Sequence, residues 1–206
     1  MSNPSLNGDP RRITKTKNWP THALLQTMNT PLQPFIRAVA FAAEKHRHQR
    51  RKDAQSSPYI NHPIELADIL VSEGGVTDLD VLMAAVLHDT VEDTETTRAE
   101  LAAHFGERIA GIVMEVTDDK NLPKDTRKRL QVEHAPQLSR EARLVKLADK
   151  ICNLRDILAS PPSGWPAQRK RDYFDWAKAV VDGLRGVNER LEIQFDATYR
   201  RKIELD

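Results

Sequence analysis

Residues 84–97, "AAVLHDTVEDTETT", join an apolar segment directly to a histidine and a run of carboxylates. If the preceding helix continues through this stretch, side chains four apart share one face. His88 would then lie beside Glu92. Asp89 would likewise lie beside Asp93. The β-branched threonines and valine of the stretch oppose a regular helix, but even a frayed turn keeps these four groups close together.

The negative charge of this cluster requires compensation, because carboxylates near a helix C-terminus oppose the helix dipole and repel one another. An ordinary acidic surface turn is one interpretation, since runs of charge are usually solvated. The pair His88 and Asp89 favours a cation site, because these two potential metal ligands directly follow an apolar helix face. Glu95 and the threonines are interpreted as surface residues that end the helix.

The rest of the chain shows helical periodicity without an alternating strand pattern. Asn61 and His62 before Pro63 are typical of a cap followed by proline at the first helical position. Asp78 and Thr97 are predicted to cap the two helices that follow them. Helices are predicted over residues 33–43, 63–72, 79–89, 99–105, 107–117, 124–135, 139–159, 173–184 and 187–195. The predicted fold class is an all-α helical bundle.

Length and composition predict one folded domain behind a leader. A chain of 206 residues suits a single domain with a substantial core. Residues 1–31 carry prolines in a polar, mildly basic context without periodicity, which predicts a flexible N-terminal leader. Residues 32–206 are predicted to form the domain, and the chain leaves no room for a second catalytic domain.

Composition argues against several classes of protein. The 31 Lys+Arg and 30 Asp+Glu residues give a formal charge of +1, so no global charge indicates a nucleic-acid binder. Cys152 is the only cysteine, which excludes an intramolecular disulfide and a cysteine-rich zinc site. No apolar run approaches the ~18 residues of a membrane span, and the N-terminus lacks the apolar core of a signal peptide. The predicted location is the reducing cytoplasm.

Two further residues complete a possible metal site. His62 stands in "PYINHP" at a predicted helix start, and Asp149 stands among apolar-periodic neighbours in "LVKLADK". Taken alone, each is more often a hydrogen-bonded structural group than a ligand. Together with His88 and Asp89 they supply two imidazoles and two carboxylates, which suits Mn²⁺, Fe²⁺, Co²⁺ or Zn²⁺ with open positions for water and a phosphate oxygen. Ligand type alone does not choose among these metals.

The order and spacing of "NHP", "LHDTVED" and "LVKLADK" resemble the H…HD…D framework of the HD-domain phosphohydrolases. The resemblance is closer to the single-domain small alarmone hydrolases, stand-alone relatives of the hydrolase half of RelA/SpoT proteins. The resemblance covers about residues 35–191. The sequence differs from the family pattern in the leader and at Cys152, where a bulkier side chain is expected. The segments that carry it are "HRHQRRKD", "PYINHP", "AAVLHDTVEDTETT", "EVTDDKNLPK", "KRLQVEHAP", "LVKLADKICNLRD" and "YFDWA".

The resemblance implies an HD-domain helical bundle with a metal site between helices, and one Mn²⁺ per chain. The implied reaction removes the 3′-pyrophosphate of (p)ppGpp and releases GDP or GTP and pyrophosphate. It also implies that Glu92 and Asp93 are the catalytic acids. Their position agrees with that role, since a carboxylate one turn from a cation can take a proton from water and orient its attack. The implied metal ligands are His62, His88, Asp89 and Asp149.

Three clusters of basic residues, within 45–52, 124–129 and 169–171, could hold such a polyanion, although most of their members are expected to be ordinary solvated charges. The resemblance implies that Arg51 and Lys52 contact the base and sugar side of the nucleotide and that Asn153 contacts the nucleoside. It implies that the phosphates are contacted by Lys124, Arg169 and Tyr173. Trp165 and Trp176 are interpreted as packing residues. The histidines interpreted as structural or exposed are His46, His48, His104 and His134.

Two other functions stay open. The same fold and metal could serve a phosphatase that acts on another nucleotide, such as the 2′-phosphate of NADPH. A catalytically silent nucleotide-binding or RNA-binding module could use the basic clusters instead. The intact pair of Glu92 and Asp93 argues against a silent module, because binding a polyanion gains nothing from two extra acids. The predicted partner is therefore a small-molecule nucleotide, with neither nucleic acid nor a membrane. The oligomeric state is left open.

Overall fold

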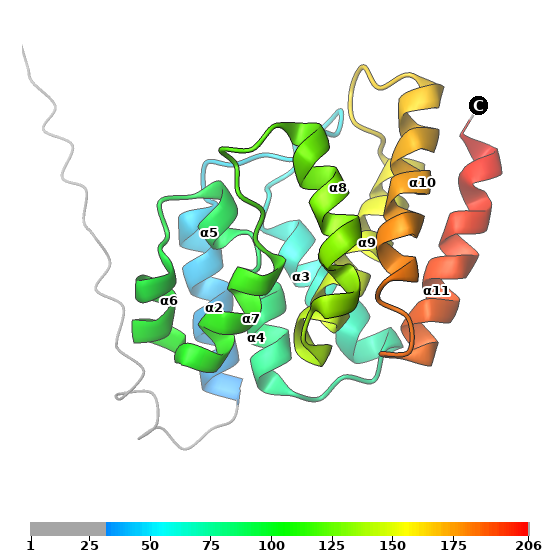
Figure 1. Cartoon of the computed structure of the whole chain (residues 1–206). Helices are drawn as coiled ribbons and strands as arrows, with labels where there is room; N and C mark the ends of the chain where they lie inside the picture. The colour runs from blue at the N-terminus through cyan, green and yellow to red at the C-terminus, as the bar shows by residue number, and fades with distance from the viewer. Residues whose placement is uncertain (1–31, 206) are drawn as a thin grey trace, which may run out of the picture.

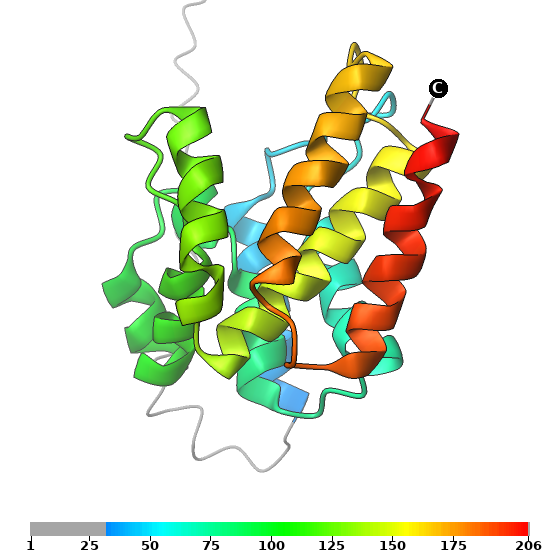
Figure 2. The same cartoon turned by 45° about the vertical axis from the view of Figure 1, so that its right-hand side comes forward.

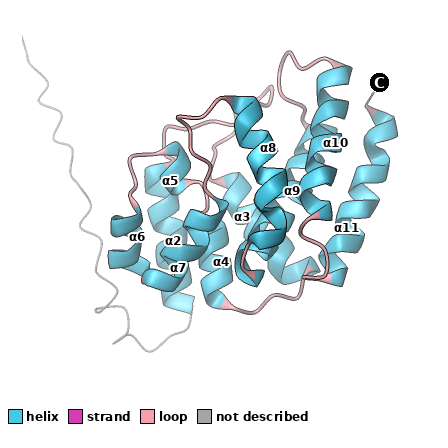
Figure 3. Cartoon of the chain, viewed as in Figure 1, coloured by secondary structure: helices cyan, strands magenta, loops and turns pink. Residues whose placement is uncertain are grey.

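The structure is a computed structural model that describes residues 32–205, so the leader predicted for residues 1–31 lies outside the described residues. Within 32–205 every regular element is a helix (Figure 3), which confirms the predicted all-α bundle. The α-helices are α2 (Leu32–Lys45), α3 (Asn61–Asp68), α4 (Leu79–Leu87), α5 (Thr90–Asp93), α6 (Arg98–Phe105), α7 (Glu107–Val116), α8 (Lys124–His134), α9 (Arg140–Ala159), α10 (Ala167–Asp182) and α11 (Glu189–Arg200). The short helices are the π-helix η1 (Ile69–Glu73) and the 3₁₀-helices η2 (Ala135–Gln137) and η3 (Arg201–Glu204).

Helix α9 runs through the middle of the bundle (Figures 1 and 2) and contacts α3, α4, α7, α10 and α11. Ser139 caps its start by accepting a hydrogen bond from the backbone N–H of Ala142. Leu147, Ile151 and Leu154 are fully buried, as expected for a helix with neighbours on most sides. Any polar residue on the inner part of α9 is therefore carried into the core.

Helix α4 is buried along most of its length. Asp78 caps it as predicted, through a hydrogen bond from the N–H of Asp80 to the Asp78 carboxylate. Every residue from 81 to 87 is buried, and α4 contacts α2, α3, α7 and α9. Because the helix points its C-terminal end into the bundle, the residues that follow Leu87 enter the interior.

The helix is interrupted at this point rather than continued. α4 ends at Leu87, and Asp89 has φ −98° and ψ 0°, outside the regular helical values. A separate single turn, α5, then carries the next residues. The Thr90 hydroxyl donates to the Leu87 carbonyl at 2.7 Å, and the Thr94 hydroxyl donates to the Thr90 carbonyl at 2.6 Å. The Thr90 hydroxyl thus binds a carbonyl at the interruption, and the Thr90 carbonyl accepts from both the hydroxyl and the N–H of Thr94.

The interpretation of all the threonines as surface residues is therefore wrong. Thr90 and Thr96 are buried, and the Thr94 and Thr96 hydroxyls hydrogen bond to each other at 2.8 Å. Glu95 is exposed, as predicted. The polar threonines can be buried because their hydroxyl groups are hydrogen bonded within the turn.

The predicted start of α3 also requires a correction. The helix begins at Asn61, so Pro63 is its third residue and neither Asn61 nor His62 is the cap. The N–H groups of Asn61 and His62 donate to the carbonyls of Pro58 and Tyr59, so no side-chain cap is needed. At the other predicted cap, Thr97 accepts a hydrogen bond from the N–H of Glu100, as expected.

Two long connections meet at one end of the bundle. The first links α2 to α3 over residues 46–60, and the second links α9 to α10 over residues 160–166. The N–H of Ser163 donates to the Lys52 carbonyl at 2.9 Å, which joins the two connections. Across the part of the chain that the structure describes, no helix has the length and apolarity needed to cross a membrane.

Candidate functional site

Three helices bring a histidine–aspartate group together in the core. His62 comes from the first turn of α3, His88 directly follows α4, and Asp149 lies in the middle of α9. One ligand atom of each residue lies within 4.8 Å of the others. His62 Nε2 is 3.3 Å from Asp149 Oδ1, and the two imidazole rings are 5.4 Å apart between centroids. The predicted metal site between helices is thus present as a compact group of donors.

Asp89 joins this group from the interruption after α4. Its Oδ2 atom lies 2.9 Å from His88 Nε2 and also accepts a hydrogen bond from the Tyr59 hydroxyl. Burial and the charge of Asp89 both raise the pKa of Tyr59, so the phenol keeps its proton and acts as a donor. Tyr59 therefore holds the Asp89 carboxylate toward the histidines.

The electrostatic field of the histidine–aspartate group favours positive charge. Burial opposes the ionised form of Asp89 and Asp149, but neighbouring positive groups outweigh it and hold both pKa values below their usual range. For Asp89 the main such group is His88, and for Asp149 it is Lys150, whose Nζ is 2.9 Å from Oδ2. Burial lowers the pKa of the His88 imidazole, yet the charges of Asp89 and Asp149 raise it to about 9. Without a cation, the group therefore holds a proton on His88.

The donors fit a divalent transition metal. His88 Nδ1 donates a hydrogen bond to the Ala85 carbonyl at 2.8 Å, so the proton that a metal would displace is the one on Nε2. That Nε2 atom is buried and lacks a hydrogen-bond partner of good geometry. Two imidazole nitrogens and two carboxylates are a donor set for Mn²⁺, Fe²⁺, Co²⁺ or Zn²⁺.

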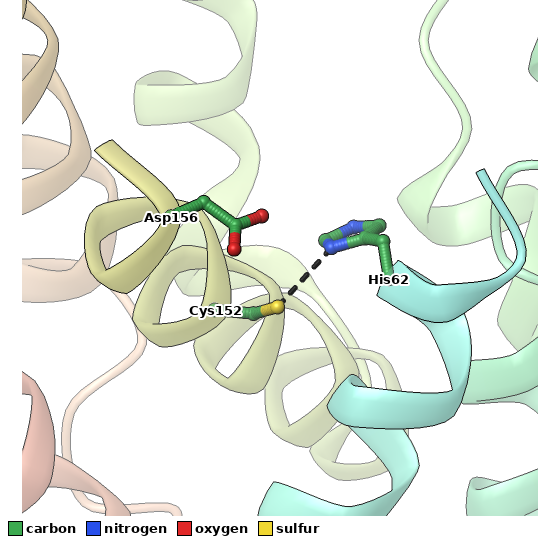
Figure 4. A group of neighbouring side chains, drawn as sticks. All are labelled: His62, Cys152 and Asp156. Carbon is green, nitrogen blue, oxygen red and sulfur yellow. Dashed lines mark hydrogen bonds between the residues drawn. The ribbon is translucent and has the colours of Figure 1, made fainter. Parts of the chain in front are cut away.

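His62 also belongs to a second group of possible ligands, with Cys152 and Asp156 (Figure 4). Cys152 and Asp156 lie one turn apart on α9, and His62 faces them from α3. His62 Nδ1 is 3.2 Å from the buried Cys152 sulfur, while Asp156 forms an ion pair with Arg51. Because burial raises the pKa of the thiol, Cys152 stays neutral here and contacts the ring nitrogen opposite Nε2. Cys152 therefore supports the His62 ring on the side that lies away from Nε2.

The two acids of α5 are held by different partners. Glu92 Oε2 accepts from the N–H of Asp118 at 3.1 Å, and Arg127 Nη1 lies 3.7 Å from Oε1. Asp93 accepts from Gln49 Nε2 at 2.7 Å and forms an ion pair with Lys120. Both acids are only partly exposed. The short helix thus presents two oriented carboxylates next to the histidine–aspartate group.

Glu92 has the more perturbed environment of the two acids. Burial is the largest effect, and the charge of Asp89 adds to it, while the hydrogen bond from the Asp118 N–H works in the opposite direction. The net result raises the pKa of Glu92 to about 7. A carboxyl group with a pKa near neutrality can exchange protons in either direction during a reaction at neutral pH.

A cavity of about 460 Å³ opens beside Asp93. It lies where the α2–α3 and α9–α10 connections meet, and both connections line it together with α9 and α10. Its wall carries three basic residues, Arg50, Arg51 and Lys52, and three acids, Asp53, Asp93 and Asp156, the last of which pairs with Arg51. Its volume suits a ligand of nucleotide size, and the basic residues can meet the anionic groups of such a ligand.

Four of the six predicted substrate contacts line this cavity, namely Arg51, Lys52, Asn153 and Tyr173. Arg169 does not line it, but its guanidinium lies 4.3 Å from the ring of Trp165, which does. Lys124 is exposed at the start of α8 and lies outside the cavity wall.

Several residues of the site escape the sequence analysis. Trp165 packs partly against the core, as predicted, and it also lines the cavity. Gln49, Tyr59 and Asp156 line the cavity too, and none of them is predicted as a site residue. Gln49 and Tyr59 stand inside segments that carry the family resemblance, which is the signal that could have drawn attention to them.

The chain matches a known family of domains over most of its described length. The HD domain family matches residues 38–173. This span includes every member of the histidine–aspartate group and both acids of α5. It also includes the cavity wall from Gln49 to Tyr173.

The chain is similar to characterised relatives over most of its length. It is 57% identical over 169 residues to guanosine-3′,5′-bis(diphosphate) 3′-pyrophosphohydrolase MESH1 of Xenopus tropicalis, covering 82% of this chain and 94% of the relative. The human protein of the same name is 56% identical, with 80% and 92% covered. A solved structure described as a metazoan orthologue of SpoT that hydrolyses ppGpp superposes with a TM-score of 0.81 at 49% identity, covering 85% of this chain and 98% of that one.

Proposed function

Because the chain belongs to the HD domain family, and within it to the MESH1-type guanosine-3′,5′-bis(diphosphate) 3′-pyrophosphohydrolases, we propose that it hydrolyses the 3′-pyrophosphate of ppGpp and pppGpp. The products are GDP or GTP and pyrophosphate. Such an activity lowers the level of the alarmone nucleotide during a starvation response. The observation that carries the proposal is the juxtaposition of a His/Asp group with buried histidines, two oriented acids, and a cavity with three basic residues on its wall.

The proposed cofactor is one Mn²⁺ per chain. Its ligands would be His62, His88, Asp89 and Asp149, whose donor types fit this ion. When bound, a divalent cation supplies Lewis-acid charge that activates water and offsets the negative charge of the phosphates. Tyr59 and the Ala85 carbonyl hold Asp89 and His88 in their ligating orientations.

The two acids have separate proposed roles. Glu92 takes a proton from the attacking water, which its raised pKa allows near neutral pH. Asp93 lies on the cavity wall, where it orients that water against the substrate phosphorus. Arg51, Lys52, Asn153 and Tyr173 bind the nucleotide in the cavity, and Arg169 and Lys124 lie farther out, where they can meet phosphate groups.

The test is an assay of ppGpp and pppGpp with the purified chain and Mn²⁺. We expect release of GDP or GTP together with equimolar pyrophosphate, and loss of turnover after chelation. NADPH is assayed in parallel for release of inorganic phosphate, because a 2′-phosphatase would use the same fold and metal. Absence of metal-dependent turnover of both alarmones would reject the proposal. Salt-sensitive RNA binding without any turnover would instead support a silent binding module.

Replacing Arg51 by lysine should weaken substrate binding. The Arg51 guanidinium pairs with Asp156, lies 3.3 Å from Asn153 Oδ1 and sits 5.7 Å from the Tyr59 ring centroid. A lysine ammonium cannot make these planar contacts together, so we expect KM for ppGpp to rise roughly tenfold with a smaller change in kcat. Arg47→Lys is the matched control, since Arg47 is exposed and lies off the cavity wall. An unchanged KM in Arg51→Lys would remove this residue from the binding site.

A further inference from the structure

A line of side-chain contacts connects the α2–α3 connection to Asp93. His46 Nδ1 is 2.6 Å from Gln49 Oε1, and Gln49 Nε2 donates to Asp93 Oδ2 at 2.7 Å. His46 is 2% exposed, and its ring lies 4.9 Å from that of Tyr59 between centroids. The contact between Gln49 and Asp93 spans 44 residues of sequence, so it is a tertiary feature of the site.

The chemistry of these groups allows one arrangement of protons. The Gln49 carbonyl oxygen only accepts hydrogen bonds, so His46 must donate from Nδ1. The Gln49 amide nitrogen then faces the Asp93 carboxylate. The flipped amide would set its oxygen 2.7 Å from the Asp93 oxygen, two acceptors with no proton between them, so the Asp93 carboxylate excludes the flip and His46 donates to the amide oxygen.

The backbone around Gln49 is fixed as well. Its N–H donates to the His46 carbonyl at 2.8 Å, and its carbonyl accepts from the N–H of Tyr59 at 3.2 Å. An isolated bridge between Arg50 and Pro58 closes the same loop. Gln49 therefore projects from a rigid turn although it belongs to a long connection.

We propose that Gln49 is a positioning residue for Asp93, and that His46 acts on Asp93 only through the Gln49 amide. The inference rests on the proposed hydrolase function, in which Asp93 orients the attacking water. Gln49 is neutral, so it fixes the carboxylate without cancelling its negative charge. Lys120, the other partner of Asp93, is half exposed and carries a positive charge, which makes it a weaker constraint on orientation.

The first experiment compares kcat and KM for ppGpp in Gln49→Leu, His46→Phe and the double variant. We expect kcat to fall roughly tenfold in Gln49→Leu, the rate equivalent of one hydrogen bond to a charged group, with KM nearly unchanged. His46→Phe keeps a ring against Tyr59 and should lower kcat less. The double variant should match Gln49→Leu alone, because the side-chain hydrogen bond of His46 is made to Gln49 and not to Asp93.

Gln55→Leu is the matched control, since Gln55 is an exposed glutamine of the same connection and lies off the cavity wall. It should behave as the unmodified protein does. A rise in KM at constant kcat in Gln49→Leu would make Gln49 a substrate contact and overturn the proposal. Additive losses in the double variant would overturn the assignment of His46.

A structural measurement separates this inference from the proposed function. Crystal structures of the unmodified protein and of Gln49→Leu should show one Asp93 rotamer in the first and a displaced or divided Asp93 side chain in the second. An unmoved Asp93 in Gln49→Leu would overturn the positioning role, whatever substrate the protein uses. Absence of ppGpp turnover in the unmodified protein would count against the function alone.

Discussion

Asp89→Ala should abolish Mn²⁺-dependent hydrolysis of ppGpp. Asp89 supplies a carboxylate that lies 2.9 Å from His88 Nε2 and is aimed by the Tyr59 hydroxyl. Its loss removes one anionic ligand and weakens the field that attracts the cation. We expect turnover to fall roughly 1,000-fold or more, since metal-derived charge stabilisation contributes several kcal/mol to such reactions.

Metal binding can be measured apart from activity. Mn²⁺ should raise the Tm of the unmodified protein, because a ligand that binds only the folded state stabilises it, and this shift should be absent in Asp89→Ala. Asp80→Ala is the control, since Asp80 lies at the far end of α4 and pairs with Arg108 at the surface. A retained Mn²⁺ shift together with retained turnover in Asp89→Ala would disprove the assigned ligand set.

The same site predicts how metal affinity depends on pH. Without metal, His88 holds its proton up to a pH of about 9. A cation must displace that proton, so lowering the pH below this value weakens Mn²⁺ binding by about tenfold per pH unit. Isothermal titration of the metal-free protein at several pH values checks this slope. An affinity independent of pH would mean that His88 does not bind the metal through Nε2.

Much of the metal group follows from local sequence signals. His88 and Asp89 stand directly after an apolar helix, and Asp149 stands inside an apolar-periodic segment, so the burial of His88 and the partial burial of both aspartates can be predicted. Their convergence with His62 cannot be predicted from periodicity, because it depends on how α3, α4 and α9 pack. The family resemblance supplied that step.

The contacts along the cavity wall are harder to predict from the sequence. Tyr59 meets Asp89 across 30 residues, and Arg51 meets Asp156 across 105. Each pair joins the α2–α3 connection, which has no periodic pattern, to a residue of another part of the fold, Asp89 after α4 or Asp156 on α9. The interruption after α4 has a local cause, the threonine hydroxyls, but a threonine in sequence is equally compatible with an exposed helix end.

Glu92→Gln combined with Asp93→Asn should stop turnover and leave the metal group intact. Both substitutions keep the size of the side chain and one acceptor oxygen, but they replace the other oxygen by an NH2 donor and remove the carboxylate base. We expect kcat to fall by roughly 10³-fold, within the range of general acid–base contributions. The Mn²⁺-induced rise in Tm should persist, because neither residue belongs to the ligand set. Glu95→Gln is the matched control, since Glu95 is an exposed acid of the same stretch.

The pH profile assigns the proton transfer to one of the two acids. Burial and the charge of Asp89 raise the pKa of Glu92 to about 7, and only its ionised form can accept a proton from water. With Mn²⁺ kept at concentrations that saturate the site at every pH, the rate should therefore fall as the pH drops through this region, with a midpoint at or below about 7 because a bound cation favours the carboxylate. Asp93→Asn alone should keep this acid limb at a lower plateau. Loss of the limb in Asp93→Asn, with its retention in Glu92→Gln, would transfer the role of base from Glu92 to Asp93.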